Sequence, residues 1–280
     1  MDAPESFRFF RLTVQYDGAA FHGWQVQPDQ RTVQGDLESV VSRLANSHRA
    51  VTGSGRTDTG VHATGQVASL GMPSSWDAKQ LKKSLNSLLS DDIWISSVSS
   101  VSPDFHPRYD ALERTYRYEV GLQPFCASPF QSRWCWPLGA SANPPPAIDH
   151  ARLDRAAQEI VGEHCFAAFA KTGQPERGTR CIVHRAEWTD TDLGVRLTIT
   201  ANRYLHHMVR YLTGTMMDIA LGRREIEDMA RLLVSPNELT TSPPAPPEGL
   251  FLHKVTYPSD DVVEAESSST PSPTRSLFRK

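Results

Sequence analysis

The chain alternates between stretches in which apolar residues recur every second position and stretches in which they recur every three or four positions. Phe10, Leu12, Val14 and Tyr16 are separated by polar residues, which is typical of a strand with one buried face. After Thr32, apolar residues follow helical spacing, and Thr32 itself is a suitable N-cap. The same two patterns predict further strands over residues 61–70, 93–101, 114–122, 181–188, 195–201 and 250–257, and further helices over 75–89, 149–161, 205–221 and 225–234.

The order of these elements predicts an α+β fold with two halves. It fits mainly antiparallel sheets flanked by helices better than a doubly wound parallel sheet. We place the N-terminal half at residues 1–106 and the C-terminal half at residues 107–258. Residues 259–280 are rich in Ser, Thr, Pro and acidic side chains, and we expect a disordered tail there.

Composition narrows the class of protein only slightly. The 280 residues are 39% hydrophobic and 22% charged, which is ordinary for a soluble globular protein. A net charge of −3 gives no overall attraction to nucleic acid. Basic residues nevertheless cluster around positions 108–117, 171–185 and 203–210, and they would form a phosphate track only if they share a concave surface.

The cysteines and the N-terminus bear on the compartment. We find no secretory signal and no apolar run near the ~20 residues that span a bilayer, so we predict a cytoplasmic protein. The four cysteines lack C-x-x-C spacing, and we expect reduced, mostly buried thiols rather than a zinc site; they are Cys126, Cys135, Cys165 and Cys181.

The segment Gly53–His62 holds one carboxylate, Asp58, in a glycine-rich turn with Arg56 beside it. We expect its three glycines to permit positive φ angles and a close approach to a ligand. Taken alone, Asp58 could cap a turn, belong to an aspartic protease dyad, or act as a lone nucleophile or base. The dyad is disfavoured because no apolar strand leads into Asp58 and because Arg56 would keep it ionised.

Other candidate motifs are weaker. Gly53-x-Gly55 lacks both the Lys-Ser/Thr of a P-loop and the third glycine of a dinucleotide fingerprint, so no nucleotide cofactor is predicted. His206 and His207 are adjacent, and adjacent side chains on a helix diverge by about a hundred degrees. We therefore expect one imidazole to pack and the other to face the cleft, with no metal bound.

A set of modest motifs occurs in a fixed order over residues 8–257. They are Tyr16-Asp17-Gly18, Phe21–Gln25, Gly55–His62, Gly65–Val67, Asp104–Arg108, Arg114–Tyr118, Asn202–Arg210 and Glu248–Leu252. In this order the chain resembles the tRNA pseudouridine synthases of the TruA family, which act on the anticodon stem-loop. It departs from the family pattern at Thr59, where alanine is more usual, and at Tyr204, where phenylalanine is common.

The resemblance implies the pseudouridine synthase fold, with a central cleft between the halves, and isomerisation of uridine in tRNA at positions 38, 39 and 40. It implies Asp58, Arg210 and Tyr116 as catalytic residues, with Arg210 pairing with Asp58 and Tyr116 stacking on the target uracil. Whether Asp58 attacks C1′, attacks C6 or removes the C2′ proton stays open.

The resemblance also implies how the substrate and partners bind. Arg56 would fill the space left by a flipped nucleotide, Leu250 would line the uracil pocket, and His207 and Tyr116 would contact substrate. It implies tRNA as the partner, a homodimer, and no cofactor. Two alternatives remain: a catalytically silent RNA-binding protein that kept the fold, and the aspartic protease.

Overall fold

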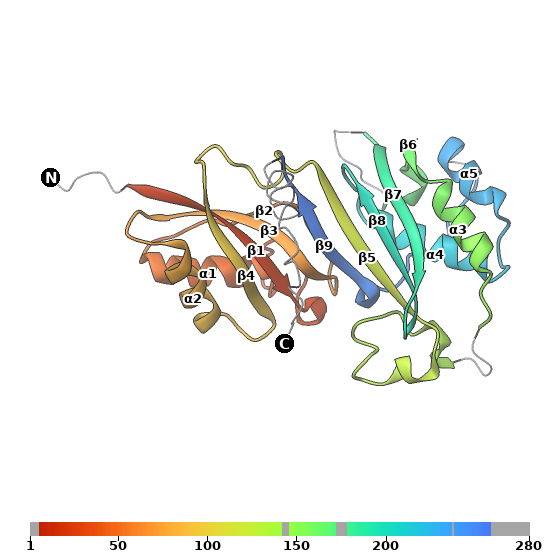
Figure 1. Cartoon of the computed structure of the whole chain (residues 1–280), viewed down its shortest axis with the longest axis horizontal. Coiled ribbons are helices and arrows are strands. Elements are labelled where there is room, and N and C mark those ends of the chain that lie inside the picture. The colour runs from red at the N-terminus through yellow and green to blue at the C-terminus, as the bar shows by residue number, and fades with distance from the viewer. Residues whose placement is uncertain (1–5, 142–145, 172–177, 237, 259–280) are drawn as a thin grey trace, which may run out of the picture.

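One continuous sheet forms the centre of the molecule (Figure 1). The computed structural model describes residues 6–141, 146–171, 178–236 and 238–258. The nine strands follow the order β4-β1-β3-β9-β5-β8-β7-β6, with β2 paired to β3. Their bounds are β1 Phe7–Tyr16, β2 Thr52–Gly53, β3 His62–Pro73, β4 Ile93–Val101, β5 Glu113–Gly121, β6 Gly162–Cys165, β7 Arg180–Asp190, β8 Gly194–Ala201 and β9 Leu250–Thr256.

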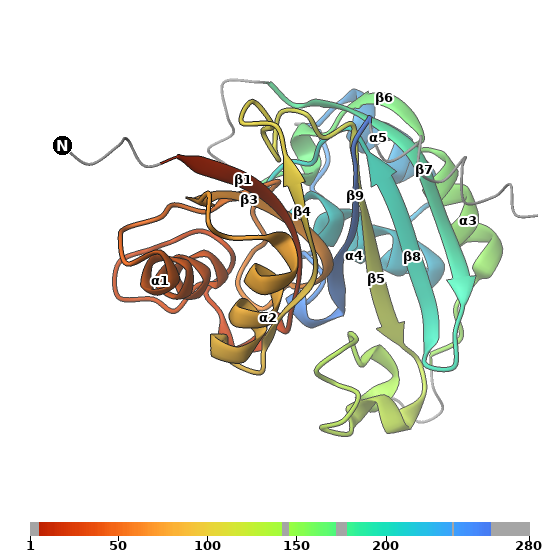
Figure 2. The same cartoon turned by 60° about the vertical axis from the view of Figure 1, so that its left-hand side comes forward.

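The helices gather in two groups at the two ends of this sheet (Figures 1 and 2). The first group is α1 Val33–Ala45 and α2 Ala78–Leu88, and the second is α3 His150–Gln158, α4 Met208–Ala220 and α5 Glu227–Val234. Thr32 caps α1 as its sequence indicates, because its hydroxyl accepts a hydrogen bond of 3.2 Å from the Gly35 amide.

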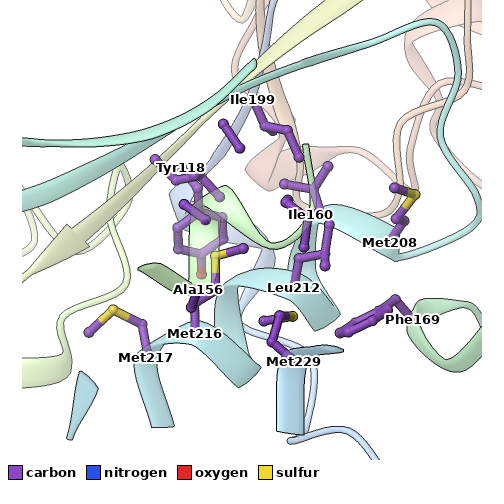
Figure 3. Close-up of a cluster of buried hydrophobic side chains, with 14 of the residues drawn as sticks. Tyr118, Ala156, Ile160, Phe169, Ile199, Met208, Leu212, Met216, Met217 and Met229 are labelled. Atoms are coloured by element: carbon purple, nitrogen blue, oxygen red, sulfur yellow. The ribbon is translucent and has the colours of Figure 1, made fainter. Parts of the chain in front are cut away.

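Each helix group covers its own hydrophobic core. The N-terminal core gathers the inward-facing residues of β1, β3 and β4 beneath α1 and α2, with Phe10, Leu12 and Val14 fully buried. The C-terminal core packs α3, α4 and α5 against β5, β7 and β8; Tyr118, Leu212 and several methionines meet there (Figure 3). Tyr116 packs against both cores, so this strand position lies between the two groups of helices.

The two parts of the sheet join through a short pairing of β3 with β9. Its register is His62 with Phe251 and Ala63 with Leu252, and it is the parallel pairing in a sheet whose other described pairings are antiparallel. Beyond it, the strands approach so closely that a Cβ at Gly65 would lie 2.1 Å from the His253 carbonyl oxygen. A glycine is therefore required at Gly65 for β9 to lie between β3 and β5.

The α+β class and the mainly antiparallel sheet are confirmed, and β4 has the predicted bounds. Two strands were missed, β2 and β6, because two and four residues are too short to show a period. The division at residue 106 falls between β4 and β5 and stays a prediction. The predicted tail lies outside the described residues.

Two further sequence predictions can be compared with the structure. The cysteines are free thiols; Cys126, Cys135 and Cys181 are buried, and Cys165 is partly exposed. Within the described ranges, no helix has the length and apolar character needed to cross a membrane.

Candidate active site

The loop between β2 and β3 carries Asp58, and its glycines serve different purposes. Gly60 has a φ of +78°, as expected. Gly53 does not have positive φ; a Cβ there would lie 2.5 Å from the Trp24 ring, so glycine is needed for packing. Gly55 has open space and no positive φ. Of the three glycines, only Gly60 uses the positive φ that glycine permits; close packing explains Gly53, and neither reason applies to Gly55.

Hydrogen bonds hold the residue before Asp58 rigidly. The Tyr16 and Thr57 hydroxyls lie 2.7 Å apart in a buried hydrogen bond. The Trp24 amide donates to the Thr57 carbonyl at 3.1 Å. On the other side, the Val61 amide donates to the carbonyl of Asp58 at 3.1 Å. The loop thus presents the Asp58 carboxylate from a fixed backbone.

Three cationic or potentially cationic groups face this carboxylate. His206 Nε2 lies 3.2 Å from Asp58 Oδ1, and His207 Nε2 lies 3.4 Å from Oδ2. Arg210 Nη1 lies 3.9 Å from the same Oδ2. Asp58 belongs to the N-terminal part of the chain and the three partners to the start of α4, so the site is assembled across the sheet.

Both histidines reach Asp58, which corrects the expectation that one packs and the other faces the cleft. That expectation placed them on a helix, but α4 begins at Met208 and His207 has a φ of 64°. This left-handed conformation is uncommon for a residue other than glycine, and such strain often occurs at functional sites. It turns the two imidazole rings toward the same carboxylate, with ring centroids 4.2 Å apart.

Arg210 is held from the side opposite Asp58. Its Nε donates a 2.7 Å hydrogen bond to the Ala245 carbonyl, and the Ala245 amide donates at 3.0 Å to the Arg210 carbonyl. The side chain is only 13% exposed, so its charge acts on Asp58 with little screening by water. The expected pairing of Arg210 with Asp58 thus has a geometric basis.

Tyr116 lies on β5 between the two cores, with its ring edge-on to Tyr204 at 4.9 Å. Burial raises the pKa of its phenol, and the negative charge of Asp58 raises it further. The phenol is therefore neutral near pH 7 and able to donate a proton or a hydrogen bond. The Tyr204 hydroxyl contacts the carbonyl oxygens of Arg114 at 3.0 Å and Ile199 at 2.9 Å, which fixes the ring against Tyr116.

The remaining predicted residues lie in different surroundings. Arg56 is exposed and donates from Nε to Gln25 Oε1 at 3.1 Å. Leu250 is 5% exposed, pairs with Tyr118 across β5 and β9, and belongs to the C-terminal core. His206 was missed as a site residue because the predicted helix began too early; only a signal for the left-handed His207 would have revealed it.

Asp58, His206 and His207 also have the donor atoms of a small metal site. One donor atom from each lies within 4.8 Å of the others, which a divalent transition ion could bridge. Arg210 opposes this because its positive charge lies 3.9 Å from Asp58 Oδ2. The arrangement suits a carboxylate paired with a guanidinium better than a metal centre.

The sequence that forms this fold matches a known class of RNA-modifying enzyme. The family model described as tRNA pseudouridine synthase matches residues 12–110 and 156–258, more than half of the chain. The chain therefore belongs to the tRNA pseudouridine synthase family.

Bacterial relatives extend the similarity to nearly the whole chain. A tRNA pseudouridine synthase A of Chlorobaculum tepidum is 38% identical over 253 residues, covering 90% of this chain and 99% of the relative. The protein of the same name from Maridesulfovibrio salexigens is 36% identical, and the match covers 88% of this chain and 89% of the relative. The one from Geobacter sp. is 35% identical, and the match covers 90% of this chain and 99% of the relative.

The environment of His207 predicts a loss of stability in mild acid. Burial lowers its pKa, and Asp58 only partly offsets this. Below the usual histidine pKa of about 6.5, the unfolded chain binds more protons than the folded one, so stability falls as pH falls. His207→Asn, which tolerates the left-handed backbone, should reduce the loss of Tm between about pH 7.5 and pH 5.5, measured by circular dichroism. An equal loss in both proteins would show that His207 does not contribute.

Proposed function

We propose that this protein isomerises uridine to pseudouridine in the anticodon stem-loop of tRNA, at positions 38, 39 and 40. The observation that carries the proposal is the lone carboxylate of Asp58, held among His206, His207 and Arg210. The names of the relatives, each a tRNA pseudouridine synthase A, support tRNA as the substrate.

The reaction requires one carboxylate and a way to expose the base. The bond from C1′ to N1 of the uracil breaks, a bond from C1′ to C5 forms, and the C5 proton leaves while N1 gains one. Asp58 starts this by attacking C1′ or C6, or by removing the C2′ proton. Because nothing is oxidised, reduced or hydrolysed, the reaction needs no cofactor.

The neighbours of Asp58 have separate tasks. Arg210 stabilises the negative charge of the carboxylate and orients it. A base within a stem must be flipped out at a cost of a few kcal/mol, and stacking on Tyr116 offsets roughly 1–3 kcal/mol of this cost. We infer that the neutral Tyr116 phenol relays the C5 proton and that His207 contacts the substrate beside Asp58. Exposed Arg56 enters the space that the nucleotide leaves, and Leu250 closes the pocket.

The basic clusters divide into RNA contacts and internal contacts. Arg108 is exposed and suits a phosphate contact. Arg180 and Arg185 instead pair with Glu163 and Glu187 on the sheet. Arg114 donates to backbone carbonyls, so we assign it an internal contact and not a phosphate contact. We place the protein with its tRNA in the cytoplasm, which cell fractionation would test.

One assay separates the isomerase from its alternatives. Isomerisation replaces hydrogen at C5, so tRNA with tritium at C5 of its uridines should release tritium to water. Asp58→Asn keeps the shape of the side chain and removes the carboxylate, and we expect its release rate to fall by at least about 10³-fold. tRNA binding should persist, as measured by filter retention.

Three outcomes would contradict parts of this proposal. Binding without release by the natural protein would indicate the silent RNA-binding alternative. Release by Asp58→Asn at an undiminished rate would remove Asp58 from the mechanism. Peptide cleavage would revive the protease, which is disfavoured because the described ion-pair partners of Asp58 are histidines and an arginine.

We also propose that the protein is a homodimer formed through the sheet face opposite α3–α5. On this face β5, β8 and β9 present Arg117, Arg196 and Phe251 around a cavity of about 360 Å³. Arg117 Nε and Glu119 Oε2 are buried there without hydrogen-bond partners among the described residues. The loop over residues 122–136 contributes Trp134 to this cavity and carries the exposed Phe130. Polar atoms left unpaired and an exposed aromatic side chain suit a protein interface.

Two matched charge insertions test this interface. Phe130 is 83% exposed in the loop, and Val234, at the end of α5, is 81% exposed. Phe130→Arg should raise the dimer dissociation constant by at least about tenfold, while Val234→Arg should leave it unchanged, as measured by sedimentation equilibrium. A natural protein that is monomeric at micromolar concentration, or equal effects of both variants, would contradict the proposed interface.

A further inference from the structure

Arg114, at the start of β5, binds four backbone carbonyls from separate parts of the chain. Its Nη1 donates to Ala111 at 3.3 Å and to Asn202 at 3.1 Å. Its Nη2 donates to Ser54 at 3.0 Å and to Arg108 at 2.7 Å. One guanidinium therefore ties together the turn before Asp58, the loop between β4 and β5, and the segment between β8 and α4.

The chemistry of this site calls for arginine. Burial lowers the pKa of Arg114, and among the described residues no carboxylate forms an ion pair with it. The planar fork of a guanidinium can reach four carbonyls in fixed directions, whereas a lysine has a single nitrogen and three donors. Arg114 is half-buried and its charge faces carbonyl dipoles instead of a carboxylate, so the side chain serves to join these backbone segments.

Two of the four carbonyls, those of Ser54 and Asn202, each precede a residue of the site by the same number of positions. Ser54 precedes Asp58 by four residues, and Asn202 precedes His206 by four residues. Each is anchored from its other side. The Ser54 amide donates to the Val67 carbonyl at 2.8 Å, and Asn202 exchanges two hydrogen bonds with Ile182. Arg114 thus fixes the separation between two rigid points, one on each side of the catalytic carboxylate.

We propose that Arg114 is a positioning residue for the isomerisation: by joining the Ser54 and Asn202 carbonyls it sets the distance between Asp58 and its partners His206, His207 and Arg210. The inference rests on the proposed function for its effect on rate, and on geometry alone for its effect on the loop. A displacement of about 1 Å at a reacting group can cost about 10²-fold in rate, so a small shift at Arg114 is sufficient to matter.

Arg114→Lys tests this role, with Arg223→Lys as the matched control. Arg223 is an exposed arginine just after the C-terminal end of α4, at the opposite end of that helix from the site, and it pairs with Asp218. We expect Arg114→Lys to lower kcat for tritium release by at least about tenfold with KM within about threefold, and the control to change neither. In Arg114→Ala, added guanidinium ion should restore part of the lost kcat. A kcat within twofold of the natural value in both Arg114 variants would overturn the proposal.

Amide hydrogen exchange gives a readout that does not require activity. In Arg114→Lys, exchange should accelerate in residues 54–60 and 202–207 while β1 and β8 keep their protection. Equal acceleration in β1 and β8 would indicate a general role in folding and would also overturn the proposal. If the natural protein released no tritium, the proposed function would fail, whereas this exchange pattern would still decide whether Arg114 couples the two segments.

Discussion

The contact between Asp58 and the start of α4 determines how the rest of the molecule must be arranged. The carboxylate comes from the loop before β3, and its three nitrogen-bearing neighbours, two imidazoles and a guanidinium, come from residues 206–210. These segments are far apart in the sequence, and they meet only because β9 joins β3 over two paired residues. The site is therefore a property of the joined sheet, and neither part of the chain contains it alone.

The residues that maintain this contact differ from those that take part in it. Gly65 allows β3 and β9 to approach each other. The Tyr16–Thr57 hydrogen bond fixes the loop that carries Asp58, and the Ala245 carbonyl accepts a hydrogen bond that holds Arg210. His207 adopts a strained conformation that directs both imidazoles toward Asp58. Such strain persists only when the surrounding structure imposes it, which is consistent with the dense bonding around the Asp58 loop and Arg114.

Periodicity predicted most of the fold because each half-buried strand and helix repeats its pattern over several residues. Thr32 marked the start of α1 for a local reason, because its side chain caps the helix. Contacts between distant segments could not be found this way. Only the ordered motifs placed Arg210 opposite Asp58, and no local signal indicated that α4 starts after His207 or that Arg114 bonds to carbonyls instead of phosphates.

The central claim is that the start of α4 holds Asp58 in its reactive position and does not simply bind RNA. Arg210→Ala tests it most directly, by comparing single-turnover tritium release with tRNA affinity measured by filter retention. The account predicts that the release rate falls by about 10²-fold or more while the Kd for tRNA stays within about threefold. Comparable losses in rate and affinity, or no loss in either, would contradict it.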